Sequence, residues 1–213
     1  MRIDFHVHTK YSPDSIINPK DLVSKACKLD ILPCISDHNL IDAHTELRKY
    51  SAQFIPAEEI RTDRGDLIGL FLTQTIPKTT EFGESLDRIR EQGGLAYLPH
   101  MYDRTRAGVI PDKSELKKID IIEIFNARCL SQDYNSKAKS FARKHKKLEA
   151  VGSDSHFLFE FGTTYNELPD FDLDSPKELL KSLRKAKFVT IPAPFYVRGT
   201  TTLVKFAKKY SII

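Results

Sequence analysis

The 213-residue sequence lacks the marks of several protein classes. Its apolar runs are all far shorter than the roughly 18 to 20 residues that cross a bilayer. The opening segment MRIDFHVHT has no signal-peptide core, because Asp4 and His6 interrupt it at once. The three cysteines show no CxxC spacing, so they indicate neither a thiolate zinc site nor a disulfide framework. We therefore expect a cytoplasmic protein with no membrane partner.

Internal repeats, low-complexity segments and Gly/Ser linkers are also missing from the sequence. We therefore expect a single domain over residues 1–213 and see no sign of an obligate protein partner. The net charge of +4 is too small to indicate a nucleic-acid binder by itself. A weak positive charge would nevertheless help to attract phosphate-bearing substrates.

What the sequence does contain is an alternation of short apolar runs with longer amphipathic stretches. The apolar runs lie at residues 3–7, 31–36, 54–56, 67–72, 95–99, 119–125, 148–152 and 188–192. Helix signals between them include Asn18 before Pro19, helical spacing over 82–92 and 134–146, and Ser175 three residues before Glu178. This alternation predicts an α/β protein with a largely parallel sheet, either a small irregular barrel or a doubly wound open sheet.

Side chains that can bind metals cluster where these runs end. His6 and His8 share one face of the first predicted strand, because strand side chains alternate. Five further candidates directly follow later runs, namely His38, Glu59, His100, Asp154 and His156. The carboxyl ends of strands are where α/β barrels and open parallel sheets assemble their sites. The pattern therefore predicts one metal site built from distant segments.

The chemistry of these side chains narrows the choice of metal. Histidine and carboxylate without thiolate suit Zn, Mn or Fe at a hydrolytic site. The candidates are too many for a single ion, so we expect two or three divalent metal ions. Such a cluster polarises a phosphoryl oxygen and generates hydroxide from bound water near neutral pH.

Five segments in order resemble the motifs of the PHP (polymerase and histidinol phosphatase) superfamily. They are DFHVHTKYSPDS (4–15), SDHN (36–39), EEI (58–60), PH (99–100) and GSDSH (152–156). The resemblance implies a distorted (β/α)7 TIM-like barrel with a trinuclear metal centre, and a short C-terminal extension within residues 157–213. It implies the metal ligands His6, His8, Asp14, His38, Glu59, His100, Asp154 and His156, all catalytic except Asp14. Asp37 would orient the ligand imidazoles.

The sequence departs from the family pattern at one position. Many members carry another histidine between the motif glutamate and the next strand, whereas here none lies between His44 and His100. Asp66 occupies roughly that place, so either Asp66 is a metal ligand or one metal is weakly held. The doublet Glu58-Glu59 also allows a register error of one, and the aliphatic Ile60 favours Glu59.

The sequence specifies the substrate less closely than it specifies the metal site. Four arginines, Arg61, Arg104, Arg106 and Arg128, follow predicted strands, and a guanidinium matches phosphate oxygens two at a time. We expect a phosphoesterase acting on a phosphorylated small molecule or nucleotide. One alternative is an exonuclease on short oligonucleotides, which would need a basic and aromatic groove. Another is a catalytically silent metal-binding module, which the nearly complete ligand set disfavours. Glu123 could face the core, orient a ligand or, least favoured, bind metal.

Overall fold

The computed structural model describes residues 1–197 and 199–212. Within them, nine strands form one sheet in the order β7-β6-β5-β4-β3-β2-β1-β8-β9. The strands are β1 (Arg2–Val7), β2 (Leu32–Ile35), β3 (Ile55–Arg61), β4 (Asp66–Leu70), β5 (Leu95–Leu98), β6 (Ile121–Asn126), β7 (Leu148–Gly152), β8 (Tyr165–Glu167) and β9 (Lys187–Val189).

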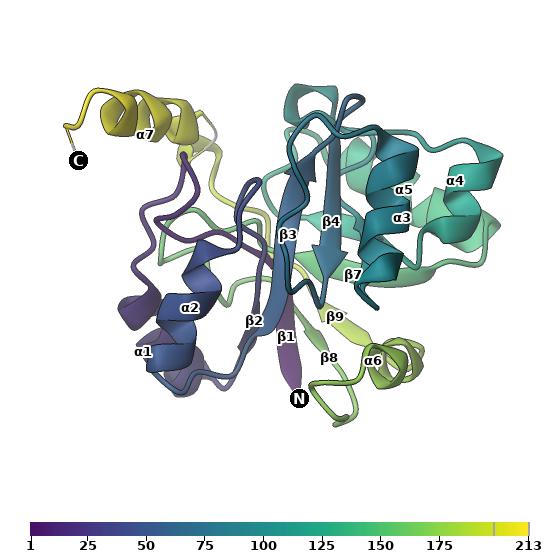
Figure 1. Ribbon diagram of the computed structural model, residues 1–213, viewed down its shortest axis with the longest axis horizontal. Helices are drawn as coiled ribbons and strands as arrows, with labels where there is room; N and C mark the ends of the chain where they lie inside the picture. Colours follow the sequence, from purple (N-terminus) through teal and green to yellow (C-terminus); the bar gives the residue numbers. More distant parts are fainter. Residues whose placement is uncertain (198, 213) are drawn as a thin grey trace.

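Helices lie around the outer side of this sheet, and the last helix lies apart from it near the C-terminus (Figure 1). They are α1 (Pro19–Leu29), α2 (Asp42–Lys49), α3 (Phe82–Glu91), α4 (Lys113–Lys118), α5 (Gln132–Lys144), α6 (Pro176–Leu183) and α7 (Thr200–Lys209), with short 3-10 turns η1 (Arg104–Arg106) and η2 (Phe195–Val197). In the described part of the chain, no helix is long and apolar enough to span a membrane.

The sheet curls until β1 meets the end of β7. Val7 forms a parallel bridge with Ser155. The backbone N–H of His8 donates to the carbonyl oxygen of Ser155 at 3.0 Å, and the N–H of Ser155 donates to the carbonyl of His6 at 3.3 Å. The predicted TIM-like barrel is therefore confirmed, and the open sheet is excluded. Closure also brings the first and last PHP-like motifs side by side.

The barrel departs from seven regular strand-helix units at β4. Strands β1, β2 and β3 run parallel, as do β5, β6 and β7, whereas β4 is antiparallel to both of its neighbours. Residues 62–65 join β3 to β4 in a tight turn, where the N–H of Thr62 donates to the carbonyl of Gly65 at 2.9 Å. So short a connection permits only an antiparallel pair, because a parallel crossover needs a dozen or more residues.

The last predicted apolar run forms a sheet extension outside the barrel. It becomes β9, which pairs antiparallel with β8, and β8 pairs antiparallel with β1. Helix α6 between them buries Leu179 and Leu183 against a cluster that includes Phe5 and Tyr97. The chain after the GSDSH segment thus packs against the barrel and covers apolar surface there.

Helix starts follow the signals in the sequence. The side-chain oxygen of Asn18 accepts a hydrogen bond from the N–H of Lys20 at 3.0 Å, and Pro19 opens α1. The hydroxyl of Ser175 accepts from the N–H of Glu178 at 3.3 Å at the start of α6. Each cap satisfies a backbone donor that has no partner inside its helix.

Gly152 is required where the barrel closes. A Cβ at this position would lie 2.5 Å from Cβ of His6 and 2.6 Å from Oε1 of Glu123. Both neighbours are fully buried side chains near the carboxyl edge of the barrel. Any larger residue would therefore push β7 away from β1.

We predict that Gly152→Ala lowers the free energy of unfolding by about 1–3 kcal/mol, the usual cost of overpacking a tight core. Thermal unfolding followed by circular dichroism measures the effect. Gly83→Ala is the matched control, since its Cβ would meet only the side chain of Glu81 at 3.3 Å. Equal melting temperatures for the two variants would contradict the close approach of β7 to β1.

Candidate metal centre

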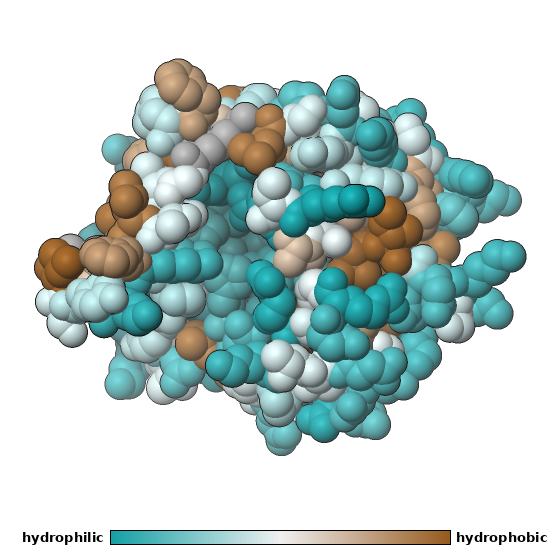
Figure 2. Space-filling view, turned by 90° about the horizontal axis from the view of Figure 1, so that it is seen from above, coloured by the Kyte–Doolittle hydropathy of each residue, from teal (hydrophilic) through white to brown (hydrophobic). Residues whose placement is uncertain are grey.

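A polar cavity of about 460 Å³ opens at the carboxyl edge of the barrel. Figure 2 shows the molecule from this side, with hydrophilic residues around a central hollow. Most of the predicted ligands either line this cavity or lie beneath it. Those that line it are Asp14, His38, Glu59, Asp66, His100 and His156.

The barrel carries each of these groups to the same place. His6 lies on β1, His8 just beyond it, and His100 follows β5. Asp154 follows β7 and, like His100, has a positive backbone φ, 55° and 29° respectively. Non-glycine residues rarely adopt this backbone, and such strain clusters at functional sites. Glu59 was expected just past its strand, but β3 is longer than predicted and Glu59 lies within it.

Glu59 is at the centre of the cluster. Its Oε1 lies 3.0 Å from Nε2 of His100. Its Oε2 lies 3.1 Å from Nδ1 of His38, 3.3 Å from Nε2 of His8 and 3.5 Å from Nε2 of His6. One carboxylate therefore reaches four imidazoles, as a bridging metal ligand would.

The neighbouring Glu58 points elsewhere. Its Oε2 accepts a hydrogen bond from the N–H of Ile76 at 2.9 Å. Burial raises the pKa of Glu58 to about 7. Since successive strand residues face opposite sides, only Glu59 of this doublet can face the cavity.

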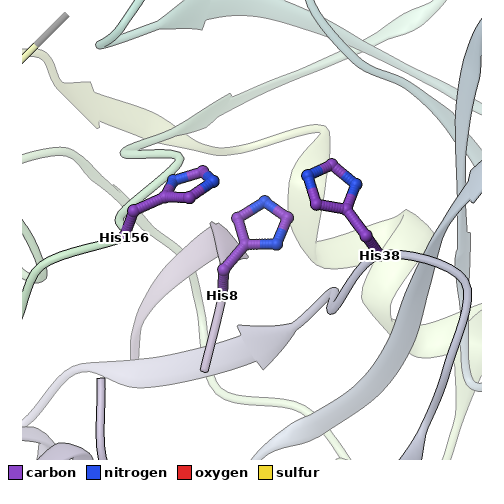
Figure 3. A group of neighbouring side chains, drawn as sticks. All are labelled: His8, His38 and His156. Carbon is purple, nitrogen blue, oxygen red and sulfur yellow. The ribbon is translucent and has the colours of Figure 1, made fainter. Parts of the chain in front are cut away.

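Asp14 lies between His38 and His156. Its Oδ2 lies 3.3 Å from Nε2 of His38, and its Oδ1 lies 3.4 Å from Nε2 of His156. Figure 3 shows the rings of His8, His38 and His156 converging from segments that follow three different strands. Ring centroids are 4.6 Å apart for His8 and His38 and 4.3 Å apart for His8 and His156.

Two further carboxylates complete the cluster. Oδ1 of Asp154 lies 3.4 Å from Nε2 of His8 and 3.6 Å from Nε2 of His6. Asp66, at the start of β4, has a carboxylate oxygen within 4.8 Å of the ligand atoms of both Glu59 and His100. Asp66 thus lies where the missing family histidine would be expected to contribute.

Hydrogen bonds fix which ring nitrogens face the centre. Nδ1 of His6 lies 3.0 Å from Glu123 Oε1, and Nδ1 of His156 lies 2.8 Å from the carbonyl oxygen of Asp154. Both oxygens only accept, so each Nδ1 carries the hydrogen. In the neutral rings the lone pair is then on Nε2, which faces the cluster. This is the tautomer that a metal ligand needs.

His8 is oriented through Ser12. The Ser12 hydroxyl donates to Oδ1 of Asp37 at 2.9 Å and lies 3.1 Å from Nδ1 of His8. It also accepts from the backbone N–H of His38 at 2.9 Å. Because the hydroxyl has one hydrogen, His8 must donate to it. Asp37, expected to orient ligand imidazoles, contacts His8 only through Ser12 and also accepts from the backbone N–H and the hydroxyl of Thr9.

The sequence did not decide between three roles for Glu123. Its Oε1 receives hydrogen bonds from Nδ1 of His6 and from the hydroxyl of Tyr97, the latter at 2.9 Å. Its Oε2 receives the N–H of His100 at 2.8 Å and the side-chain amide of Asn126 at 3.0 Å. Both oxygens are engaged, so Glu123 orients two histidines from below. Its position on a strand next to the cluster was the available signal.

The cluster contains buried atoms that a cation would satisfy. Among the described residues, Asp14 Oδ1, Glu59 Oε2 and Asp154 Oδ1 are buried without a hydrogen bond of good geometry. Nε2 of His6 and Nε2 of His8 are only 3.1 Å apart. With a hydrogen on Nδ1 of each ring, the two Nε2 atoms can approach this closely only with a cation between them, either a proton or a metal ion. These donors therefore fit a group of divalent metal ions.

The pKa values of the buried imidazoles shift in different directions. Burial lowers the pKa of His8 and of His156 to about 4. Both rings are therefore neutral at physiological pH, with Nε2 free to bind a metal.

His6 and His38 respond in the opposite direction. Burial by itself would lower the pKa of His6, but the carboxylates around it, Asp154 first, raise it well above its usual range. Glu59 and Asp14 likewise outweigh burial at His38 and raise its pKa to about 9. Protons on these rings supply the positive charge that the carboxylates require in the absence of metal.

Two of the predicted phosphate-binding arginines are paired with cluster carboxylates. Arg61 donates from Nε and Nη2 to the two oxygens of Asp66 at 2.5 and 3.1 Å. Arg106 forms an ion pair with Asp154, which raises the pKa of Arg106 and keeps that of Asp154 well below its usual range. Both arginines line the cavity.

The other two arginines lie in contrasting environments. Arg128 is buried, and its Nη1 donates to both oxygens of Glu160 at 2.8 Å. Its Nη2 donates to the carbonyl of Val197 at 2.9 Å. Arg104 is exposed and is not among the cavity-lining residues. Arg128 lines the cavity as Arg61 and Arg106 do, while also holding η2 in place.

Comparison with known proteins places this geometry in a family. A family model described as PHP-associated matches residues 132–188. The whole chain is 39% identical to Uncharacterized protein MJ0417 of Methanocaldococcus jannaschii, and the match covers 93% of that protein. The five motifs now lie around one cavity in a barrel. This chain belongs to the PHP superfamily.

Several solved structures are similar to this fold. One is a two-domain protein of Bacteroides vulgatus containing a predicted PHP-like metal-dependent phosphoesterase, with a TM-score of 0.73, 14% identity, and coverage of 90% of this chain and 65% of that one. Another is the lesion-specific endonuclease PfuEndoQ of Pyrococcus furiosus, with a TM-score of 0.60, 16% identity, and coverage of 88% and 58%. This chain spans less than two thirds of either protein.

We predict that Ser12→Ala weakens binding of divalent metal by about 10- to 100-fold, as loss of a partner that orients a ligand commonly does. The substitution frees the His8 ring and removes a donor from Asp37. Titration calorimetry with Mn²⁺ measures the affinity. Ser140→Ala, on the exposed side of α5, is the control and should leave it unchanged. Equal affinities for both variants would show that Ser12 does not orient His8.

Proposed function

We propose that this PHP protein is a metal-dependent phosphoesterase acting on a phosphorylated small molecule or nucleotide. The proposal rests on one observation, the buried cluster in which imidazole nitrogens and unsatisfied carboxylate oxygens converge at the cavity floor. His6, His8, His38, Glu59, His100, Asp154 and His156 would hold two or three ions of Zn, Mn or Fe. Asp14 and Asp66 would be additional oxygen ligands. Residues 1–213 would act as one domain, with residues 157–213 including a C-terminal extension.

The side chains of the site suit hydrolysis of a phosphate ester. Bound divalent ions polarise phosphoryl oxygens and activate water. Arg61 and Arg106 border the cavity, where their guanidinium groups would neutralise phosphate charge and exclude bulk water from one side. The hydrogen bonds that Glu123 and Ser12 accept from the rings of His6 and His8 keep these two imidazoles oriented, so they need little rearrangement.

A PHP-type exonuclease on short oligonucleotides is the second candidate. The fold shared with the Pyrococcus furiosus endonuclease favours this reading. An exonuclease would need aromatic side chains free to stack on bases. Tyr102, two residues after His100, is instead half-buried and packs edge-on against Phe141 with centroids 6.4 Å apart. We therefore rank the nuclease second. A catalytically silent module is third, because the whole candidate ligand set is brought together.

We predict two or three divalent ions per chain in protein reconstituted with Mn²⁺, measured by elemental analysis, together with hydrolysis of a generic aryl phosphate. Chelation should abolish turnover and lower the melting temperature. Stabilisation by bound ligand amounts to about 2.7 kcal/mol when the free metal is a hundred times its Kd. Protein that takes up no metal would refute the proposed metal centre. Metal uptake with turnover of oligonucleotides alone would favour the nuclease.

We predict that His8→Ala combined with Asp154→Ala reduces turnover by about 10³-fold or more, because loss of even a ligand's orienting partner costs about 10- to 100-fold. The fold should persist at lower stability, because Asp154→Ala leaves Arg106 without its ion-pair partner. Steady-state kinetics and circular dichroism provide the two measurements. His145→Ala, at an exposed histidine outside the cluster, should retain full activity. Retained turnover in the double variant would rule out the assigned site.

A further inference from the structure

The C-terminal helix α7 reaches the candidate metal cavity. It lies above the carboxyl edge of the barrel, far from the N-terminus in Figure 1. Thr201, Thr202 and Lys205 line the cavity together with the predicted metal ligands. Sequence reasoning singled out none of these three, because α7 lies well beyond the last recognised motif at residues 152–156.

Specific contacts hold α7 over the site. The ammonium group of Lys208 donates to the carbonyl oxygens of Lys10 and Ser12 at 2.6 and 2.7 Å. At the start of the helix, the carbonyl of Val197 accepts from Thr200 and from buried Arg128 at 2.6 and 2.9 Å. The helix is therefore fixed against the loop that carries the predicted ligand Asp14.

Lys205 is the cation that α7 brings into this cavity. Its Nζ lies 3.0 Å from Oδ2 of Asp14, and its side chain is 51% exposed. An ammonium has three N–H donors, so contact with one carboxylate oxygen leaves capacity for another anion. Arg106 and Arg128 are less available, with side chains 21% and 2% exposed and their guanidinium groups paired with carboxylates.

We propose that Lys205 binds the phosphoryl oxygens of the substrate, which makes α7 a substrate-binding element of this PHP domain. The inference rests on the proposed phosphoesterase function and names a contact within that site. A lysine ammonium is a compact charge suited to phosphate. A phosphate in the cavity would be bordered by Lys205 on the α7 side and by Arg61 and Arg106 on the barrel side.

A competing explanation is that Lys205 only neutralises Asp14. The two explanations predict different effects of removing the charge. A counterion for Asp14 would alter the affinity for metal and leave phosphate binding at saturating metal unchanged. A phosphate-binding residue would alter phosphate binding even when the metal sites are saturated.

The test compares Lys205→Gln, Lys205→Arg and the wild-type chain at saturating Mn²⁺, with Lys209→Gln as control. Lys209 lies exposed on the same helix and is not among the cavity-lining residues. Titration calorimetry with inorganic phosphate gives the Kd, and aryl phosphate hydrolysis gives KM and kcat. Manganese titration of each variant reports the metal affinity separately.

We expect Lys205→Gln to raise the phosphate Kd and the substrate KM by about tenfold, the effect of losing one charge-assisted hydrogen bond, with a smaller change in kcat. Lys205→Arg should restore most of the binding, and Lys209→Gln should match wild type. Unchanged phosphate Kd in Lys205→Gln, or wild-type protein that binds no phosphate, would overturn the proposal. If phosphate binding depends on Lys205 but the wild-type protein hydrolyses no phosphate ester, the role of Lys205 in phosphate binding is upheld and the phosphoesterase function is refuted.

Discussion

Burial of Glu59 and Asp154 among imidazoles is the electrostatic constraint to which the rest of the structure is fitted. Both carboxylates are almost fully removed from solvent, and burial by itself would raise their pKa values. Neighbouring positive charge outweighs burial and keeps both pKa values well below their usual range. Isolated charges in such surroundings would cost several kcal/mol each. The cluster is therefore stable only with cations at its centre, whether these are protons on His6 and His38 or metal ions.

The polar groups around this cluster determine its geometry. Glu123 and Ser12 hold imidazoles by their outer nitrogens, so that the inner nitrogens face one another. Closure of the barrel between Val7 and Ser155 sets the distance between the first and last motifs. The lack of a side chain at Gly152 permits that approach. Orientation of the ligands thus depends on the backbone of the barrel as much as on their own side chains.

Much of this arrangement could be predicted from the sequence, for identifiable reasons. Ligands at the ends of apolar runs were detectable because parallel strands end at a common edge. Asp14 came only from the family resemblance, since an aspartate after a proline is ordinarily a turn residue. The antiparallel β4 escaped prediction because apolar runs do not encode direction. Lys205 was missed and the pairing of Arg128 with Glu160 was not predicted, because ion pairs between distant segments and the return of α7 are properties of tertiary packing.

Pairing between the two ends of the chain has a consequence for biosynthesis. The N–H of Ser153 donates to the side chain of Asp4, 149 positions away, and Lys208 reaches Lys10 across 198 positions. A ribosome releases β1 early, so its buried Asp4 and His6 meet their partners only after nearly the whole chain has been synthesised. Contacts of such long range form late and slow folding. The side chains of the candidate metal centre therefore come together only when nearly the whole chain is available to fold.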